Sequence, residues 1–347
     1  MNHHKTAFAR VLLPVFACLL LLVSARADEV VGWGDVTLPD PPPGQVNRIA
    51  AGNSHALALG SSGVITAWGS NYDYDANYAG QAEAPAYNDF AAIAAGLYHS
   101  LALTSDGAIA GWGSNLDRDG NFIGQATPPA GSGFAAIAAG WYHSLALTAD
   151  GTIISWGDSN FGLADVPAGN GFRAVSGGCL HSIALAADGS IRAWGGNNYG
   201  QTDAPAGDDY IAIAAGGWHS LALKADGSIV GWGDDWGGQA TPPAGNDYIA
   251  IAAGSSHSLA LKANGQIAAW GSDWAGQATA PAGMDFTAIA AGEGYSLALR
   301  RACHYLLAGD VNKDCRVDFD DLAVIAENWL IDCNAIPADG VCISQLE

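Results

Sequence analysis

The chain has 347 residues, of which 50% are hydrophobic and 14% charged, and 34 acidic side chains face 13 basic ones, for a formal net charge of −21. A surface this acidic repels phosphate, so the composition excludes nucleic acid as a partner and favours solubility and cation binding.

The N-terminus has the pattern of an export signal. Lys5 and Arg10 precede an apolar run over 11–23, and Ala25-Arg26-Ala27 fits a small-x-small cleavage site. The run is short for a membrane span, and no other stretch is apolar enough to be one. We therefore expect residues 1–27 to be a signal peptide and the protein to be secreted, extracellular or on the cell surface.

One sequence unit recurs over 28–301, with the form AAG-xx-HSLAL-xx-DG-x-I-xx-WG followed by GQ and PAG. Its histidines are His55, His99, His143, His181, His219 and His257, with Tyr295 in the seventh place. Its tryptophans are Trp33, Trp68, Trp112, Trp156, Trp194, Trp232 and Trp270. A period near 40 residues with short apolar segments and Asp-Gly or Asn-Gly hairpin turns predicts a β-propeller, and each unit reads as four passes of strand.

The two ends of the repeat region are out of phase. Trp33 has no AG-xx-His before it, and Tyr295 has no WG after it. If 30–33 pairs with 295–299, the two incomplete units form one blade and no sheet edge stays open. The predicted fold is therefore an all-β, seven-bladed β-propeller in which the N-terminal strand closes the last blade.

Units such as AAGWYHSLALTADGTIISWG resemble the regulator of chromosome condensation repeat over 28–301. Within that superfamily, the AIAAG-xx-HSLAL and WG…GQ elements are most similar to those of the secreted bacterial propellers that inhibit β-lactamases. That resemblance implies a seven-bladed propeller and, among other roles, inhibition of a secreted or periplasmic enzyme.

Residues that recur in every blade are expected to be structural, because a catalytic histidine is needed once. The turn before each histidine and the loop after each WG vary, and chain direction places both at the same end of a blade. Aromatic residues there are candidates for a ligand-binding face. They are Tyr98, Trp141, Tyr142, Trp218, Phe161, Tyr199, Trp236 and Trp274.

Two loops at that end are enlarged, and both read N-x-D-x-D-x-N. Alternating oxygen ligands resemble the first half of a calcium loop, although neither loop has a distal acid. Turn chemistry is the alternative interpretation. The candidate metal ligands are Asp73, Asp75 and Asn77 in one loop and Asp117, Asp119 and Asn121 in the other.

After a linker over 302–308, residues 309–333 contain a second signal, and 334–347 form a tail. The oxygen spacing of an EF-hand-like calcium loop, followed by a helix, is present. Its ligands are Asp310, Asn312, Asp314, Arg316 through its carbonyl, Asp318 and Asp321. The segment resembles a single type I dockerin repeat, which implies bound calcium and a cohesin-like protein partner, although Cys315 replaces the usual glycine.

Cys303, Cys315, Cys333 and Cys342 predict disulfides in this exported segment. Direct pairing of Cys315 with Cys333 looks awkward across the predicted helix, and the other pairings stay open.

These observations favour a monomeric, non-catalytic protein whose propeller face binds a protein or glycan and whose tail docks or tethers it. The alternatives are an enzyme or component of extracellular polysaccharide degradation, for which Asp73, Asp75, Asp117 and Asp119 would supply carboxylates, and an inhibitor of a secreted enzyme.

Overall fold

A computed structural model describes residues 28–40 and 45–301. The predicted signal peptide, linker, calcium module and tail lie outside these residues. Within the described chain, no helix is long and apolar enough to cross a membrane.

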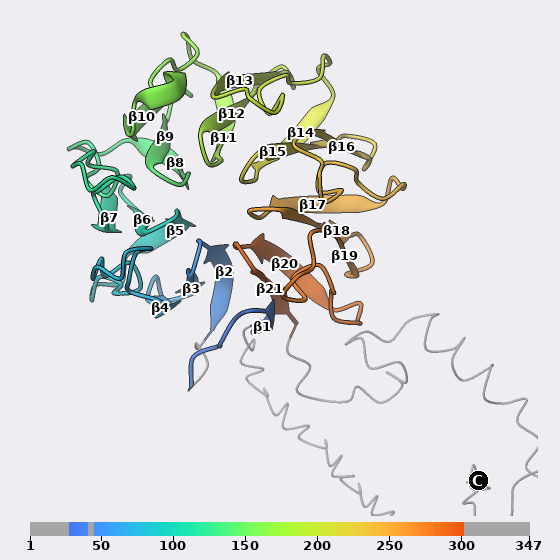
Figure 1. The fold of residues 1–347 in the computed structure, drawn as a ribbon, viewed down its shortest axis with the longest axis horizontal. Helices are drawn as coiled ribbons and strands as arrows, with labels where there is room; N and C mark the ends of the chain where they lie inside the picture. Colours follow the sequence, from blue (N-terminus) through green and yellow to red (C-terminus); the bar gives the residue numbers. More distant parts are fainter. Residues whose placement is uncertain (1–27, 41–44, 302–347) are drawn as a thin grey trace, which may run out of the picture.

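Seven three-stranded antiparallel sheets are arranged in a ring around a central axis (Figure 1). Blades 1 to 3 consist of β2 (Val46–Ala51), β3 (His55–Gly60) and β4 (Ile65–Gly69), then β5 (Phe90–Ala95), β6 (His99–Thr104) and β7 (Ile109–Gly113), then β8 (Phe134–Ala139), β9 (His143–Thr148) and β10 (Ile153–Gly157). Blades 4 to 6 consist of β11 (Phe172–Gly177), β12 (His181–Ala186) and β13 (Ile191–Gly195), then β14 (Tyr210–Ala215), β15 (His219–Lys224) and β16 (Ile229–Gly233), then β17 (Tyr248–Ala253), β18 (His257–Lys262) and β19 (Ile267–Gly271). A 3₁₀ turn, η1 (Asn160–Gly162), follows β10.

Blade 7 combines the two ends of the repeat region, which confirms the predicted closure. Its strands are β20 (Phe286–Ala291), β21 (Tyr295–Arg300) and β1 (Glu29–Gly34), and β1 pairs with β21 from Glu29↔Arg300 to Gly34↔Tyr295.

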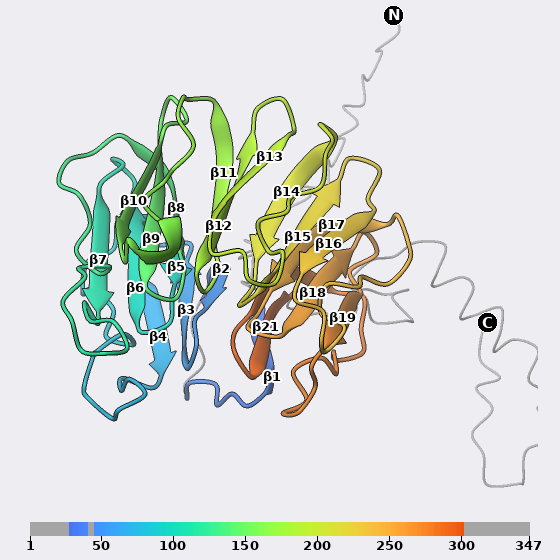
Figure 2. The same cartoon turned by 45° about the horizontal axis from the view of Figure 1, so that its top comes forward.

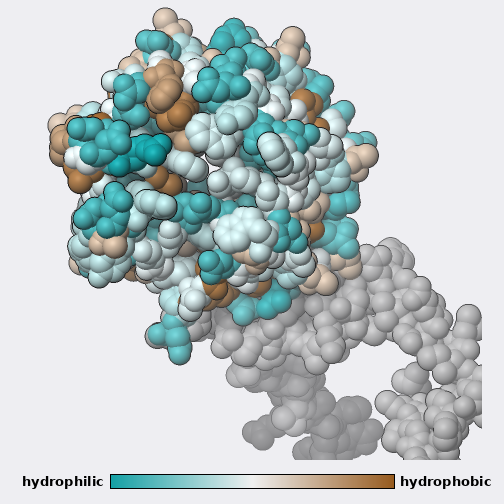
Figure 3. All heavy atoms as spheres, viewed as in Figure 1, coloured by the Kyte–Doolittle hydropathy of each residue, from teal (hydrophilic) through white to brown (hydrophobic). Residues whose placement is uncertain are grey.

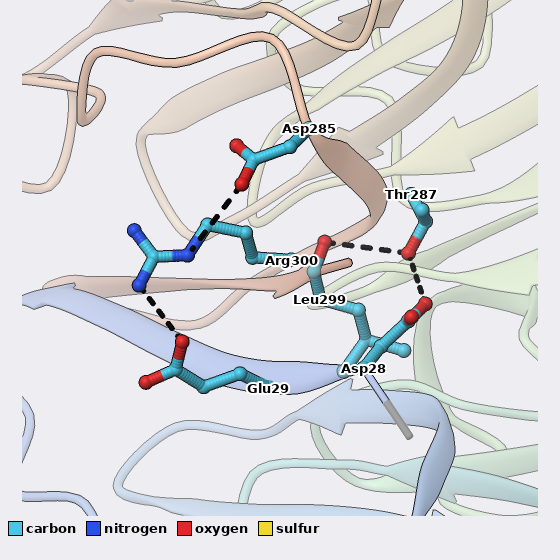
Figure 4. Close-up of polar contacts among 6 residues, drawn as sticks. All are labelled: Asp28, Glu29, Asp285, Thr287, Leu299 and Arg300. Carbon is cyan, nitrogen blue, oxygen red and sulfur yellow. Dashed lines mark hydrogen bonds and ion pairs between the residues drawn. The ribbon is translucent and has the colours of Figure 1, made fainter. Parts of the chain in front are cut away.

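Side-chain contacts reinforce this pairing at the outer end of β1 (Figure 4). Arg300 lies 2.8 Å from Glu29 and 3.8 Å from Asp285, and the Thr287 hydroxyl donates to Asp28 at 2.5 Å. The ring is therefore held shut by ordinary strand pairing between residues far apart in sequence.

The prediction of four passes per blade is wrong, because each sheet has three strands. The chain after WG, expected to supply the fourth pass, forms a loop. Its glycines, asparagines and aspartates make local turn bonds, such as Ala82 N–H to Asn71 Oδ1 at 2.7 Å, in place of a ladder. Figure 2 shows these loops after β4 and β7 at one side of the disc.

Blade packing follows from the alternation in the middle strand. In β3, Leu57 and Leu59 are fully buried against Phe90 and Ala102 of blade 2. The small residues at the intervening positions, such as Ala58, pack against blade 7. Because strand side chains point alternately to opposite faces, each interface joins leucines from one blade to alanines from the next. The repeated HSLAL sequence thus specifies close blade-to-blade contact.

A buried hydrogen bond crosses six of the seven interfaces. The repeat histidine of one blade contacts, through Nε2, the serine that follows the repeat His or Tyr of the next blade, at 2.7–2.9 Å. Five of these serines donate their hydroxyl hydrogen to the backbone carbonyl of the loop glutamine, at 2.9–3.2 Å. Those serines therefore accept from Nε2–H, which fixes the neutral tautomer of the partner histidine. The prediction that the histidines are structural is confirmed.

Candidate functional site

The two variable loops of every blade lie side by side, as predicted from chain direction. In each blade, the residue after WG donates its backbone N–H to the carbonyl of the residue before the repeat His or Tyr, for example Ser70 to Ser54 at 2.8 Å and Asp35 to Gly294 at 2.9 Å. We call the surface formed by these loops the paired-loop face. Figure 3 looks on to this face and shows mostly hydrophilic and neutral side chains around a central hollow.

All eight predicted aromatics lie in the loops of this face, but they differ in exposure. Tyr98, Trp141, Tyr142 and Trp218, next to the repeat histidines, are half-buried. Those in the loops after WG are exposed, and Trp236 is the most exposed at 97%. The exposed ones are Phe161, Tyr199, Trp236 and Trp274.

Three of these aromatics form one cluster. The rings of Trp141 and Trp218 are 6.0 Å apart in an edge-to-face arrangement, and Tyr199 lies 5.7 Å from Trp218. Trp141 and Trp218 come from blades 3 and 5, and the turn of blade 4 between them carries the buried Cys179. The backbone N–H of Cys179 donates to Gly217 O at 3.1 Å, so the turns are held together. A rigid, partly apolar platform therefore spans three blades.

Burial shifts the titration of the groups around this platform away from neutral pH. Desolvation raises the pKa of Tyr142 to about 12, with a smaller contribution from Tyr98. Desolvation also raises the pKa of the Cys179 thiol, which keeps it protonated and unreactive. The platform offers contact area and no nucleophile.

Charge on the paired-loop face is strongly one-sided. Within the described residues, Arg118 is the one basic side chain in its loops. Acidic side chains come from nearly every blade, among them Asp75, Asp119, Asp235 and Glu293. The basic residues Lys224, Lys262 and Arg300 lie at the other ends of their blades, where each pairs with an acid. The paired-loop face is thus complementary to a cationic surface.

The two enlarged loops have the hydrogen bonds of turns. The Asp73 carboxylate accepts from the backbone N–H of Asp75 and Asn77 at 3.0 and 2.8 Å, and Asp117 makes the same contacts with Asp119 and Asn121. Among residues 28–40 and 45–301 no group of three or more His, Cys, Asp or Glu side chains is placed to hold a metal. Turn chemistry explains these loops as they stand, and calcium binding by them stays a prediction.

The same loops present aromatic residues that the sequence analysis missed. Tyr72, Tyr74 and Tyr78 are 54%, 91% and 59% exposed, and Phe122 is 73% exposed. In the first loop these rings alternate with Asn and Asp residues as Y-x-Y-x-x-x-Y, and this spacing is the sequence signal for them. These side chains extend the set of exposed aromatic residues on the paired-loop face to blades 1 and 2.

The interface between blades 7 and 1, which we call the seam, departs from the other six. At those six, the repeat tryptophan donates its Nε1–H to a loop carbonyl, at 2.9 Å to a glutamine in five cases and at 3.2 Å to Leu163 in the sixth. At the seam, the buried Nε1 of Trp68 has no hydrogen-bond partner among residues 28–40 and 45–301. Ala56 takes the place of the bonding serine, and Tyr295 takes the place of the histidine.

Tyr295 compensates for part of this loss. Its hydroxyl donates to the backbone carbonyl of His55 at 2.5 Å and lies 3.2 Å from that of Gly52. Burial raises its pKa, so the hydroxyl stays a donor. Beside it lies a cavity of about 550 Å³, larger than the central hollow of about 160 Å³.

The predicted calcium ligands of the C-terminal segment, Asp310, Asn312, Asp314, Arg316, Asp318 and Asp321, lie outside the described residues.

The repeats match the family model described as the regulator of chromosome condensation (RCC1) repeat, over 46–74, 90–118, 134–163, 172–201, 210–239 and 248–277. The chain belongs to this family. No match was found among curated proteins.

Solved structures share the propeller fold at low identity. Prp20p from Saccharomyces cerevisiae is 18% identical, with 88% of this chain and 95% of that one covered and a TM-score of 0.66. Human WBSCR16 is 18% identical, with 80% and 100% covered and a TM-score of 0.63. The ectodomain of the Physcomitrella patens receptor kinase CR4 is 21% identical, with 72% and 68% covered and a TM-score of 0.58.

Proposed function

We propose that the propeller is a non-catalytic scaffold that binds a protein partner through its paired-loop face. The observation that supports this most is the combination of the Trp141–Trp218–Tyr199 platform with acidic loops that contain one basic residue. Clustered aromatic side chains supply most of the binding energy at protein interfaces, while one-signed charge speeds association and selects a basic partner. Prp20p, a structural relative, has a reported binding to Gsp1p and histones, and a complex of Kap60 with Prp20 has been solved.

The histidines and carboxylates of the described propeller are held in hydrogen bonds that suit a non-catalytic role. The repeat histidines are buried, uncharged and bonded to serine in six equivalent places, so none is available as a general base. The Asp73 and Asp117 carboxylates lie in turns on adjacent blades with their oxygens bonded to amide hydrogens. Neither carboxyl has an apolar setting of the kind that makes a general acid.

Site-specific photo-crosslinking tests the proposal. A photoreactive amino acid replaces Trp236, which is 97% exposed on the paired-loop face, or Ile249, which is 56% exposed on β17. After irradiation in an extract of the producing cells, we expect a discrete protein adduct from position 236 that weakens with salt. The double variant Asp75→Lys/Asp119→Lys should reduce the adduct, because the carboxylates of Asp75 and Asp119 accept no hydrogen bond from the described residues, so the substitutions change the charge of the face and leave the turns intact. Equal labelling from position 249, or an adduct insensitive to salt and to charge reversal, would overturn the proposal.

We further propose that the protein is exported and that its C-terminal segment binds one calcium ion through Asp310, Asp314 and their neighbours, docking or tethering the propeller. The oxygen spacing of the sequence supports this. Calorimetric titration of the full chain should show a single calcium event that Asp310→Ala/Asp314→Ala abolishes and Asp117→Ala leaves unchanged. A glycan partner, or inhibition of a secreted enzyme such as a β-lactamase, would be separated from the main proposal by the chemical nature of the crosslinked species.

A further inference from the structure

The loop that follows WG differs at the seam from its equivalents at the other interfaces. At five interfaces a glutamine of the loop after WG is buried between blades, and its backbone carbonyl accepts from the tryptophan of the next blade. Among the described residues, Asp35–Pro39 line the corresponding position after Trp33, and this segment includes no glutamine. Trp68 therefore keeps a donor that its six equivalents have satisfied, although only 7% of this residue is exposed. A buried N–H without an acceptor is unfavourable and is relieved by any carbonyl that reaches it.

A cavity occupies the corresponding space. Its volume of about 550 Å³ is within the range of small-ligand sites. Trp68 and Ala56 form part of one wall, and Val36 and Leu38 of the short segment form another. Val36 and Leu38 pack against the cluster that contains Trp68, and the Nε1 atom of Trp68 is itself buried beside the cavity.

The rim of the cavity carries negative charge and an aromatic ring. Asp35 and Glu293 line it, Glu293 is exposed, and Trp274 is 69% exposed. Carboxylates beside an indole face attract Lys or Arg side chains through charge and cation–π contact. No basic side chain of the described chain lines the cavity.

We propose that this seam cavity binds a turn of a partner protein, with a backbone carbonyl of the turn accepting from Trp68 Nε1–H and a basic side chain between Glu293 and Trp274. At the six other interfaces, the indole N–H of the repeat tryptophan donates to a backbone carbonyl of a loop. A carbonyl of a partner's turn is therefore the acceptor that fits Trp68. The inference rests on the proposed protein-binding function and names a specific site and partner chemistry for it.

The chain supplies its own probe. Residues 237–243 (GGQATPP) fill the equivalent space between blades 5 and 6, with Gln239 O bonded to Trp270. The experiment uses this peptide, capped at both ends, with an added N-terminal Lys or, as a matched control, an added N-terminal Glu. Indole N–H signals of the ¹⁵N-labelled full chain are followed by NMR, with the Trp68 signal assigned from Trp68→Phe.

We expect the Trp68 signal to move downfield on titration, and the Lys peptide to bind at least threefold more tightly than the Glu peptide. Trp68→Phe should weaken binding about fivefold to tenfold, the size of one lost hydrogen bond. Trp156→Phe, whose indole is already bonded to Gln125 O, should leave the affinity unchanged. Glu293→Gln should remove the preference for Lys, which keeps the test informative if Trp68→Phe unfolds.

Shifts confined to other tryptophans, or equal affinities of the Trp68→Phe variant and the parent, would overturn the proposal. So would a Trp68 signal that already lies downfield in the free full chain, since another part of the chain would then occupy the cavity. If the Trp68 signal moved with a neutral oligosaccharide and with neither peptide, the proposal of a protein ligand would be wrong and a glycan would be the ligand of this cavity. Failure here with a positive crosslink at position 236 would leave the scaffold function intact and remove only the seam site.

Discussion

The six buried histidines predict that the propeller unfolds in mild acid. Each is nearly inaccessible to water, and burial lowers its pKa from 6.5, to about 4 for His55, His143 and His257 and to about 3 for His99, His181 and His219. In the unfolded chain these imidazoles recover a pKa near 6.5 and bind protons first. Their contribution to stability is therefore complete above pH 6.5 and is lost as the pH falls toward 4.

The size of the effect follows from the pKa difference. A pH of 5 is about 1.5 units below the pKa of an unfolded histidine. Protonation therefore stabilises the unfolded chain by about 2 kcal/mol for each site. Six sites together lose about 12 kcal/mol, which is comparable to the whole stability of a typical domain. Hydrogen bonds lower the pKa of five turn carboxylates, so these groups stay ionised in this window and do not offset the loss; they are Asp106, Asp117, Asp150, Asp188 and Asp226. We expect the unfolding midpoint to lie near pH 5.

Circular dichroism and tryptophan fluorescence during an acid titration, with proton uptake measured by potentiometry, check this expectation. Several protons should be taken up in one cooperative step. The seam offers a matched control, because the double variant His257→Tyr/Ser296→Ala copies the pair Tyr295 and Ala56 and removes one titrating site. Its midpoint should fall by a few tenths of a pH unit. A parent midpoint below pH 4, or uptake of no proton above that pH, would refute the reasoning.

Three further predictions concern stability, each measured by denaturant unfolding. Tyr295→Phe removes the hydroxyl bonded to a blade 1 carbonyl and should lower the free energy of unfolding by about 1–2 kcal/mol, whereas Tyr199→Phe on the exposed loop should change it little. Leu221→Ala empties a fully buried contact between blades and should cost about 2–5 kcal/mol, while Ile211→Ala, at a 49% exposed site, should cost under about 0.5 kcal/mol. Gly96→Ala would place a methyl carbon 2.4 Å from a histidine ring carbon and 2.5 Å from a backbone oxygen, so it should destabilise by about 1–3 kcal/mol or more; parental stability of that variant would contradict the packing described for the inner strands.

The repeat itself was enough to predict most of the architecture. Seven tryptophans and seven His or Tyr positions, out of phase at the two ends, predicted the pairing of Trp33 with the strand of Tyr295, and the structure has that pairing. The number of strands per blade was not predictable in the same way. A segment such as 70–89 is bounded by turn residues and contains apolar positions, and only the tertiary structure shows that its amides bond locally rather than to a neighbouring strand.

The candidate site was predicted in position but not in organisation. Chain direction placed Trp141 and Trp218 on one face, and the structure places them there. Their ring contact, 6.0 Å across an intervening blade, depends on how tightly blades 3, 4 and 5 pack around the axis, which no single repeat encodes. Tyr295 and Ala56 depart from the repeat at distant positions of the sequence. Only the structure shows that both departures fall at the same interface between blades 7 and 1.

What the sequence by itself determined is the set of local rules, namely Leu–Ala alternation for blade contacts, Asp-Gly turns, and one polar pair per interface. These are short-range patterns, and each repeat carries the whole of its own pattern. Only the tertiary structure decided how the interface that closes the ring is built. At the interface of blades 7 and 1, Tyr295 and Ala56 lie in one cluster, Trp68 Nε1 has no acceptor within the described part of the chain, and a cavity lies beside them. That outcome required residues separated by more than two hundred positions to be brought into contact, because a closing interface is specified by two chain ends rather than by one repeat.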